Sequence, residues 1–169
     1  FLAARRAFGL DGISDALLLT EAIADAAPGR FVDGEVPYFD HGDHQPLEYP
    51  VLTGAFMWVA AEIVKPLAGS GVDVRAVRFY DGNAVLLGLA ALVAVAATML
   101  AAGRRPWDAA LVAASPVLAL DATINWDLFA VALTALSVLA WARRRPGLAG
   151  ILLGLAISAK FYPVVLLVL

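Results

Sequence analysis

The sequence predicts an all-α, polytopic integral membrane protein. Of its 169 residues, 62% are hydrophobic and only 16% are charged, and the mean hydropathy is +0.80. A soluble domain of this length would have to expose much of that apolar surface to water. The charges are also divided along the chain: acids dominate the first half, whereas arginines cluster in the second, at Arg104-Arg105 and at Arg143 to Arg145. Apolar stretches with short charged connections are typical of a transmembrane helix bundle.

Residues 1–50 form the part of the chain that we expect to face water. Leu17 to Ala27 is predicted as a short amphipathic helix, which Pro28-Gly29 ends. The glycines and prolines between Gly34 and Pro50 then indicate an irregular loop that is both acidic and aromatic.

Residues 51–66 are predicted to form a helix in the membrane interface. Val51 to Val64 is apolar and is bracketed by Pro50 and Pro66. Because it is shorter than the roughly 20 residues that a full crossing needs, we expect it not to span the membrane.

Residues 67–169 are predicted to hold about four transmembrane helices, and we expect the protein to extend beyond both ends of the chain. The first predicted helix is long enough to cross the membrane. The two in the middle are too short for a full crossing unless their polar ends open into a water-filled recess, and Lys160 and Pro163 interrupt the last one. The four predicted spans are Phe79 to Ala102, Asp108 to Leu120, Leu128 to Ala142 and Leu148 to Leu169.

The arginines predict the orientation in the membrane. If both middle spans cross, Arg104-Arg105 and Arg143 to Arg145 share one side, which the positive-inside rule makes cytoplasmic. Asp127 then faces outside, and Lys160 lies about 20 Å along the last span, nearer the outer surface. Since 51–64 does not cross, the acidic loop faces outside as well.

Two ionisable residues in the apolar half are candidate site residues. Asp127 follows Asn125-Trp126, and Lys160 precedes an aromatic pair. A charge within a membrane is costly unless it lines a cavity or is paired, which favours a functional role. Two simpler interpretations stay open: Asp127 caps the helix that begins at Leu128, or Lys160 extends to the interface without a partner.

Other chemistries find little support in the sequence. Cysteine is absent, which excludes disulfides and thiolate sites, and neither a phosphate-binding glycine loop nor an Asp-x-Asp pair occurs. His41 and His44, with Asp40 and Asp43, have the atoms to bind a cation. A spacing of three in a glycine-containing loop does not preset ligand geometry, so a solvated loop is the alternative.

Three motifs resemble a known family when they are taken in order. Glu48 to Gly54 (EYPVLTG), Ile124 to Leu128 (INWDL) and Ala159 to Pro163 (AKFYP) are similar to those of glycosyltransferase family 87. These are polyprenol-phosphate-mannose-dependent mannosyltransferases of the GT-C superfamily. The resemblance implies a GT-C type helix bundle with an extracytoplasmic first loop.

The resemblance also implies roles for particular residues. The carboxylate of the first loop, the general base of such enzymes, falls on Asp15, with Asp40 as the alternative. Glu48 matches the glutamate before the proline, Asp127 the second external carboxylate, and Lys160 the later lysine. Asp15, Asp127 and Glu48 are therefore the expected catalytic residues.

Substrate binding requires cations near the phosphate that departs. Lys160, Arg75 and Arg78 lie towards the predicted outer side, although Arg75 and Arg78 are also open to a role as ordinary juxtamembrane charges. The expected substrate-binding set consists of Lys160, Arg75, Arg78, Tyr49, Tyr162 and Asp40. One phosphate carries less charge than a nucleotide diphosphate, so we expect neither a metal nor a cofactor.

The predicted function is transfer of a sugar from a polyprenyl-phosphate donor to an extracytoplasmic glycolipid or glycan, and mannose is the expected sugar. We expect a multi-pass protein of the plasma membrane, whose partners are lipid, donor and acceptor, and not nucleic acid. The alternatives are a transporter or flippase subunit with buried charges along its substrate path, and a purely structural membrane module.

Overall fold

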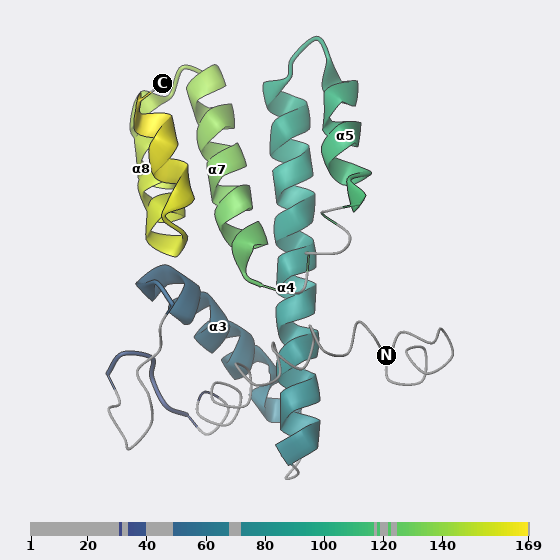
Figure 1. Ribbon diagram of the computed structural model, residues 1–169, viewed down its shortest axis with the longest axis vertical. Coiled ribbons are helices and arrows are strands. Elements are labelled where there is room, and N and C mark those ends of the chain that lie inside the picture. The colour runs from purple at the N-terminus through teal and green to yellow at the C-terminus, as the bar shows by residue number, and fades with distance from the viewer. Residues whose placement is uncertain are drawn as a thin grey trace.

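The computed structural model describes residue 31 and residues 34–39, 49–67, 72–116, 118, 122 and 125–168. The regular structure in these ranges is helical, as predicted. Figure 1 shows α4 (Val72–Ala101) as a long central column with α5 (Ala109–Ala113) on one side. On its other side stand α7 (Asp127–Ala142) and α8 (Pro146–Ala159), and α3 (Val51–Val64) crosses below these two. The predicted helix Leu17 to Ala27 lies outside the described residues.

The helix α4 has 30 residues and is therefore about 45 Å long. Its segment Val77–Ala101 has a hydropathy of 2.5 and is, by length and composition, able to cross a membrane. Small or apolar residues recur at helical spacing along one buried stripe, which packs against the neighbouring helices. This stripe consists of Phe79, Leu87, Ala90, Ala94 and Ala97.

The predicted span Asp108 to Leu120 is not one continuous helix, because the helical geometry is interrupted at Ala114 and Ser115. After the 3₁₀ turn η2 (Pro106–Asp108), α5 has only five residues and ends at Ala113. Ser115 follows outside any helix, and Pro116 and Leu118 are helical again. Proline lacks the N–H that a continuing helix needs, and it disfavours helical geometry in the residue before it.

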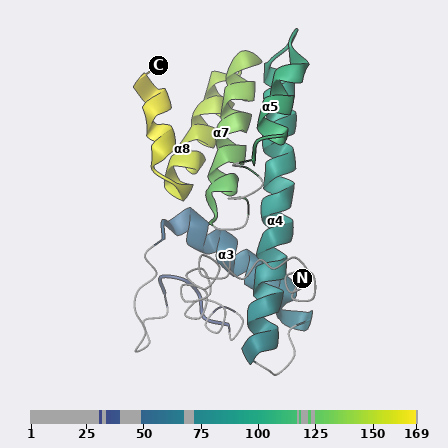
Figure 2. The ribbon, with the colours of Figure 1, turned by 45° about the vertical axis from the view of Figure 1, so that its right-hand side comes forward.

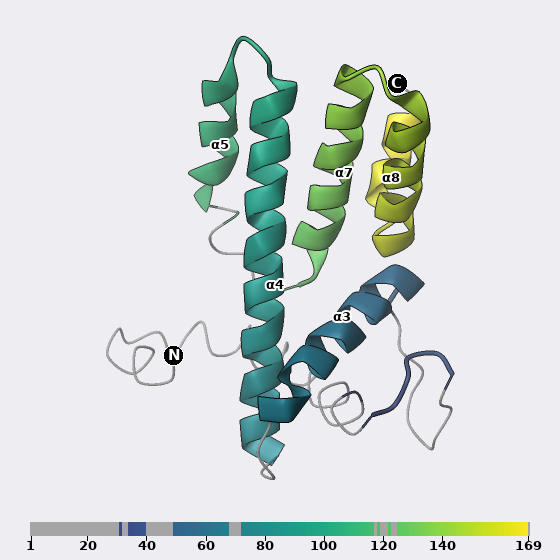
Figure 3. The same ribbon diagram turned by 180° about the vertical axis from the view of Figure 1, so that it is seen from behind.

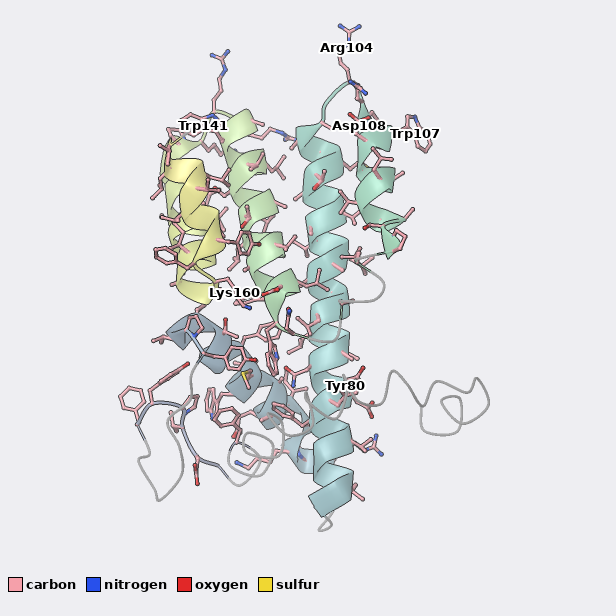
Figure 4. All side chains as sticks on the ribbon, viewed as in Figure 1. Tyr80, Arg104, Trp107, Asp108, Trp141 and Lys160 are labelled. Carbon is pink, nitrogen blue, oxygen red and sulfur yellow. The ribbon has the colours of Figure 1, made fainter. Side chains whose placement is uncertain are left out.

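The helices α7 and α8 form an antiparallel hairpin. Ser137 is buried and its hydroxyl donates a hydrogen bond to the carbonyl of Ala149 at 2.8 Å, which ties the two helices together. With 16 and 14 residues, they are about 24 and 21 Å long, shorter than a hydrocarbon core of about 30 Å. Figure 4 shows Arg104 and Trp141 at one end of the bundle and Lys160 at the other end of this hairpin.

The predicted span Leu148 to Leu169 is also wrong, because the chain reverses in the middle of it. The helix α8 ends at Ala159, and Lys160 is extended, with φ −148° and ψ 141°. The 3₁₀ helix η3 (Tyr162–Val168) then runs back beside α8, as the views in Figures 1 and 2 agree. Pro163 cannot donate the next helical hydrogen bond, which accounts for the break.

The helix α3 has the predicted bounds. Figure 3 shows it running obliquely from below α8 to the lower part of α4. It crosses α4 at Gly82, where an added Cβ would lie 2.6 Å from Cγ1 of Val64, so the close approach needs glycine. Phe56 of α3 stacks on Phe129 of α7, with centroids 4.5 Å apart. The core therefore lies where α3, α4 and α7 meet.

Candidate functional site

Asp127 and Lys160 form an ion pair at the end of the α7–α8 hairpin that adjoins α3. Asp127 is the first residue of α7 and Lys160 directly follows α8, and Nζ of the lysine lies 2.6 Å from Oδ1 of the aspartate. The side chains are 42% exposed for Asp127 and 30% for Lys160. The alternative interpretation, that Lys160 extends to the interface without a partner, is therefore wrong.

The two oxygens of the Asp127 carboxylate differ in their surroundings. Oδ1 faces Lys160, is closed to solvent, and accepts no well-aligned hydrogen bond within the described residues. The contact is thus an attraction between charges rather than a directional hydrogen bond. The side chain as a whole is nevertheless 42% exposed.

Asn125 leaves the Asp127 side chain free for this pair. The amide oxygen of Asn125 accepts the backbone N–H of Asp127 at 2.8 Å, so Asn125 satisfies one of the donors that a helix start leaves unpaired. The interpretation of Asp127 as the cap of a helix beginning at Leu128 is wrong, because the helix begins at Asp127 itself. A carboxylate in the first turn still interacts favourably with the helix dipole.

A buried hydrogen-bond chain fastens the start of α7 to α4. The indole N–H of Trp126 donates to Oδ1 of Asn83 at 2.7 Å, and Nδ2 of Asn83 donates to the carbonyl of Phe79 at 2.8 Å. Trp126 and Asn83 are each 5% exposed. Sequence reasoning missed Asn83, although an amide at the start of the long apolar stretch of α4 is a signal for such a contact.

The aromatic loop before α3 contacts the same place. Tyr49 meets the ring of Trp126 edge-on, with centroids 5.1 Å apart. The hydroxyl of Tyr38 donates to the carbonyls of Tyr49 at 2.7 Å and Pro50 at 3.0 Å. Burial raises the pKa of Tyr38, so this phenol keeps its proton for these bonds. Tyr38 has a φ of 68°, which an ordinary residue adopts only when its contacts hold it there.

Tyr162 and Thr53 lie beside the lysine. Tyr162 interacts with the hydroxyl of Thr134, and the charges of Asp127 and Lys160 both act on its phenol. Thr53 donates a hydrogen bond of 2.6 Å to the carbonyl of Ala159, the residue before Lys160. Thr53 is part of the EYPVLTG motif, but no role was predicted for it.

The structure does not bring every predicted residue to the pair. Arg78 is half-exposed and lies 4.0 Å from Asp81, its neighbour on α4. It lies five positions before Asn83, about 140° around the helix, so it faces well away from the side of α4 that contacts Trp126. The backbone of Arg75 lies in α4, but its side chain is outside the described part of the structure.

The carboxylates expected from the first loop also lie outside the described residues. These are Asp15, Asp40 and Glu48, and the same holds for His41, Asp43 and His44. Among the residues that the structure does describe, there is no group of three or more metal-ligating side chains. Asp127, Lys160, Tyr49 and Tyr162 are thus the predicted site residues that the fold gathers together.

Comparison with known proteins identifies the family. Residues 49–169 match the family model of glycosyltransferase family 87, and this stretch holds α3, α4, α7, α8 and the ion pair. Neither a curated protein nor a solved structure matches the chain. The match covers well over half of the sequence, and it begins at Tyr49, which contacts Trp126. The chain therefore belongs to glycosyltransferase family 87 and is a membrane glycosyltransferase.

Proposed function

We propose that this protein transfers mannose from a polyprenyl-phosphate donor to an extracytoplasmic glycolipid or glycan, with inversion at the anomeric carbon. The observation that carries the proposal is the Asp127–Lys160 pair, a partly exposed cation and carboxylate 2.6 Å apart in a chain of glycosyltransferase family 87. Lys160 binds the phosphate of the donor, and Asp127 is one of the carboxylates at the reacting centre.

The reaction needs an acid–base partner and a stabilised leaving group. The acceptor hydroxyl oxygen attacks the anomeric carbon while the bond from that carbon to the phosphate oxygen breaks, and the phosphate leaves with the electron pair. A carboxylate takes the hydroxyl proton, and a nearby cation stabilises the charge that grows on the phosphate. Asp15 is the proposed base, with Asp40 as the alternative, and Glu48 completes the set. The proposed reaction uses no metal.

The ion pair suggests how the donor engages the site. An incoming phosphate competes with Asp127 for the ammonium of Lys160, and both side chains are exposed enough to be reached. When the ammonium turns to the phosphate, the Asp127 carboxylate loses its partner and faces the sugar. Tyr162, whose phenol lies near both charges, and Tyr49, which contacts Trp126 next to Asp127, are proposed to contact the sugar donor.

We propose that the pair faces the outer side of the plasma membrane in a multi-pass GT-C arrangement. Two features support this orientation: the arginine turns lie at the opposite end of the hairpin, and cytoplasmic loops favour arginine. The helices α7 and α8 are too short to cross the whole hydrocarbon core, so the pair at their end lies below the outer membrane surface. In this arrangement α3 lies in the interface and covers that end of the hairpin.

The donor-binding role is tested by Lys160→Ala, with Lys65→Ala as the matched control. Lys65 also pairs with a carboxylate, Glu62 at 3.1 Å, but at the far end of α3. Loss of a charged contact should weaken binding of labelled polyprenyl-phosphate-mannose to the purified protein by about ten- to a hundredfold. Lys65→Ala should bind normally. Unchanged binding in Lys160→Ala contradicts the proposal, and donor movement across vesicles without transfer favours the transporter alternative.

The orientation is tested by labelling single cysteines, for which the absence of native cysteine leaves no background. Arg104→Cys and Phe161→Cys place thiols at the two ends of the bundle, and Phe161 is 74% exposed. An impermeant thiol reagent should reach position 161 from outside intact cells and position 104 only after the cells are opened. Labelling of both from the same side contradicts the orientation.

A further inference from the structure

Thr53 makes an unusual contact between α3 and the end of α8. Its side chain is fully buried, and its hydroxyl donates a 2.6 Å hydrogen bond to the carbonyl of Ala159, 106 residues away. A threonine in a helix ordinarily bonds to a carbonyl one turn back, as Thr98 does with Ala94 and Thr134 with Ala130. Thr53 instead reaches another helix.

The carbonyl that Thr53 binds has no helical donor. In a continuing helix the carbonyl of Ala159 would accept the N–H of the residue four positions later, which here is Pro163. Proline has no N–H. Ala159 is fully buried, so without Thr53 its carbonyl would lack both a helical partner and water.

The peptide unit held in this way is the one that leads into Lys160. Its carbonyl belongs to Ala159 and accepts from Thr53, and its N–H belongs to Lys160 and donates to the carbonyl of Ala156 at 2.9 Å. Both polar ends of this peptide plane are therefore tied down. The starting direction of the Lys160 side chain follows from the orientation of that plane.

We propose that Thr53 is a positioning residue, which orients the peptide before Lys160 so that its ammonium meets Asp127 and, in turn, the donor phosphate. The second half of this statement rests on the proposed function, in which Lys160 binds the phosphate. The first half concerns only where the ammonium lies. Helix α3 thereby takes part in substrate binding through a residue that does not touch the substrate.

The variants Thr53→Val and Thr53→Ser separate the hydroxyl from the shape of the side chain. Valine keeps the shape of threonine and removes the hydroxyl, whereas serine keeps the hydroxyl. In Thr53→Val, reconstituted in lipid nanodiscs, affinity for polyprenyl phosphate should fall by about three- to tenfold. Thr53→Ser should bind nearly as wild type does. Equal affinity in wild type and Thr53→Val overturns the proposal.

Ser137→Ala is the matched control for general loss of packing. Its hydroxyl also makes a buried bond to a carbonyl of α8, that of Ala149, about 16 Å along the helix from Lys160. It should lower stability without changing affinity. Thr53→Val should also add little further loss in a Lys160→Ala background, since its effect passes through the lysine. If Thr53→Val lowers the affinity as much in the Lys160→Ala background as in the wild type, the role of Thr53 is merely structural and the proposal is overturned.

A second readout follows the lysine without any donor. The rate at which a water-soluble amine reagent acylates Lys160, relative to exposed Lys65, should rise in Thr53→Val and stay at the wild-type value in Thr53→Ser and Ser137→Ala. A raised rate with normal donor binding in Lys160→Ala contradicts the proposed function but supports the positioning. An unchanged rate in folded Thr53→Val contradicts the positioning itself.

Discussion

At the end of the bundle where α4 turns into η2 and α7 into α8, charged side chains lie in solvent. Arg105 pairs with Asp108 at 3.2 Å, three residues away, and the arginine is 79% exposed. Trp107 and Trp141 are exposed there as well. At the other end, Asp127 is the first residue of α7 and Lys160 directly follows α8, and buried hydrogen bonds of Thr53 and Asn83 hold the residues next to them.

The difference separates two uses of charge in one membrane protein. In the proposed orientation, the arginine end needs only its positive charge and its place in the sequence, since topology depends on charge in the loops. In the proposed function, the Asp127–Lys160 end needs a defined geometry, because a reacting sugar and phosphate must meet particular atoms. A substitution should therefore be nearly silent at the first end and damaging at the second.

The largest effect is expected for Asp127→Asn, compared with Asp108→Asn at the arginine end. Asparagine keeps the shape of Asp127 and removes the charge that pairs with Lys160, so the transfer rate should fall about 100-fold if the carboxylate acts at the reacting centre. Asp108 belongs to an exposed pair, and its variant should transfer at nearly the wild-type rate. Similar rates in both variants would remove the distinction between the ends.

A smaller effect is expected for Asn83→Leu, which tests the bonds beneath the pair. Leucine leaves the buried indole N–H of Trp126 without its acceptor, so the free energy of unfolding should fall by about 1–3 kcal/mol. Circular dichroism in detergent during denaturation measures this. Thr98→Val is the control, because the hydroxyl of Thr98 bonds within α4 and its removal breaks no contact between helices. Equal losses of unfolding free energy in the two variants would show that the hydrogen bond between helices stabilises the protein no more than one within a helix.

The smallest effect is expected for Gly82→Ala, compared with Gly88→Ala six residues later in α4. The methyl group at position 82 would lie 2.6 Å from Cγ1 of Val64, which forces α3 and α4 apart and should cost about 1–2 kcal/mol. At position 88 nothing lies within 4 Å, so alanine should stabilise the helix by up to about 1 kcal/mol. A stabilising Gly82→Ala would show that the crossing is looser than described.

Several helix ends followed from local chemistry. Pro50 and Pro66 bracket α3, and its bounds were predicted correctly, while α7 begins one residue before its predicted start. The two predicted spans that the structure interrupts, Asp108 to Leu120 and Leu148 to Leu169, have a common feature. In each, hydropathy continues across a proline, Pro116 or Pro163, and hydropathy was given more weight than the missing N–H that prevents one continuous helix.

The candidate site was predictable only where an isolated residue was costly. Asp127 and Lys160 stood out because a charge among apolar residues needs a partner, and that argument requires no knowledge of the fold. It did not say that they are each other's partner. Arg78 was also expected to bind substrate, with a role as an ordinary juxtamembrane charge left open, and it lies on an exposed face of α4 beside Asp81.

The sequence by itself determined that this is a helical membrane protein with motifs of glycosyltransferase family 87, and which ionisable side chains required an explanation. Tertiary structure alone decided which of them meet and which uncharged residues support them. Thr53, Thr98 and Thr134 look alike in sequence, because any helical threonine can bond within its own helix. Only the packing of α3 under α8 offers Thr53 a carbonyl that Pro163 has left without a donor.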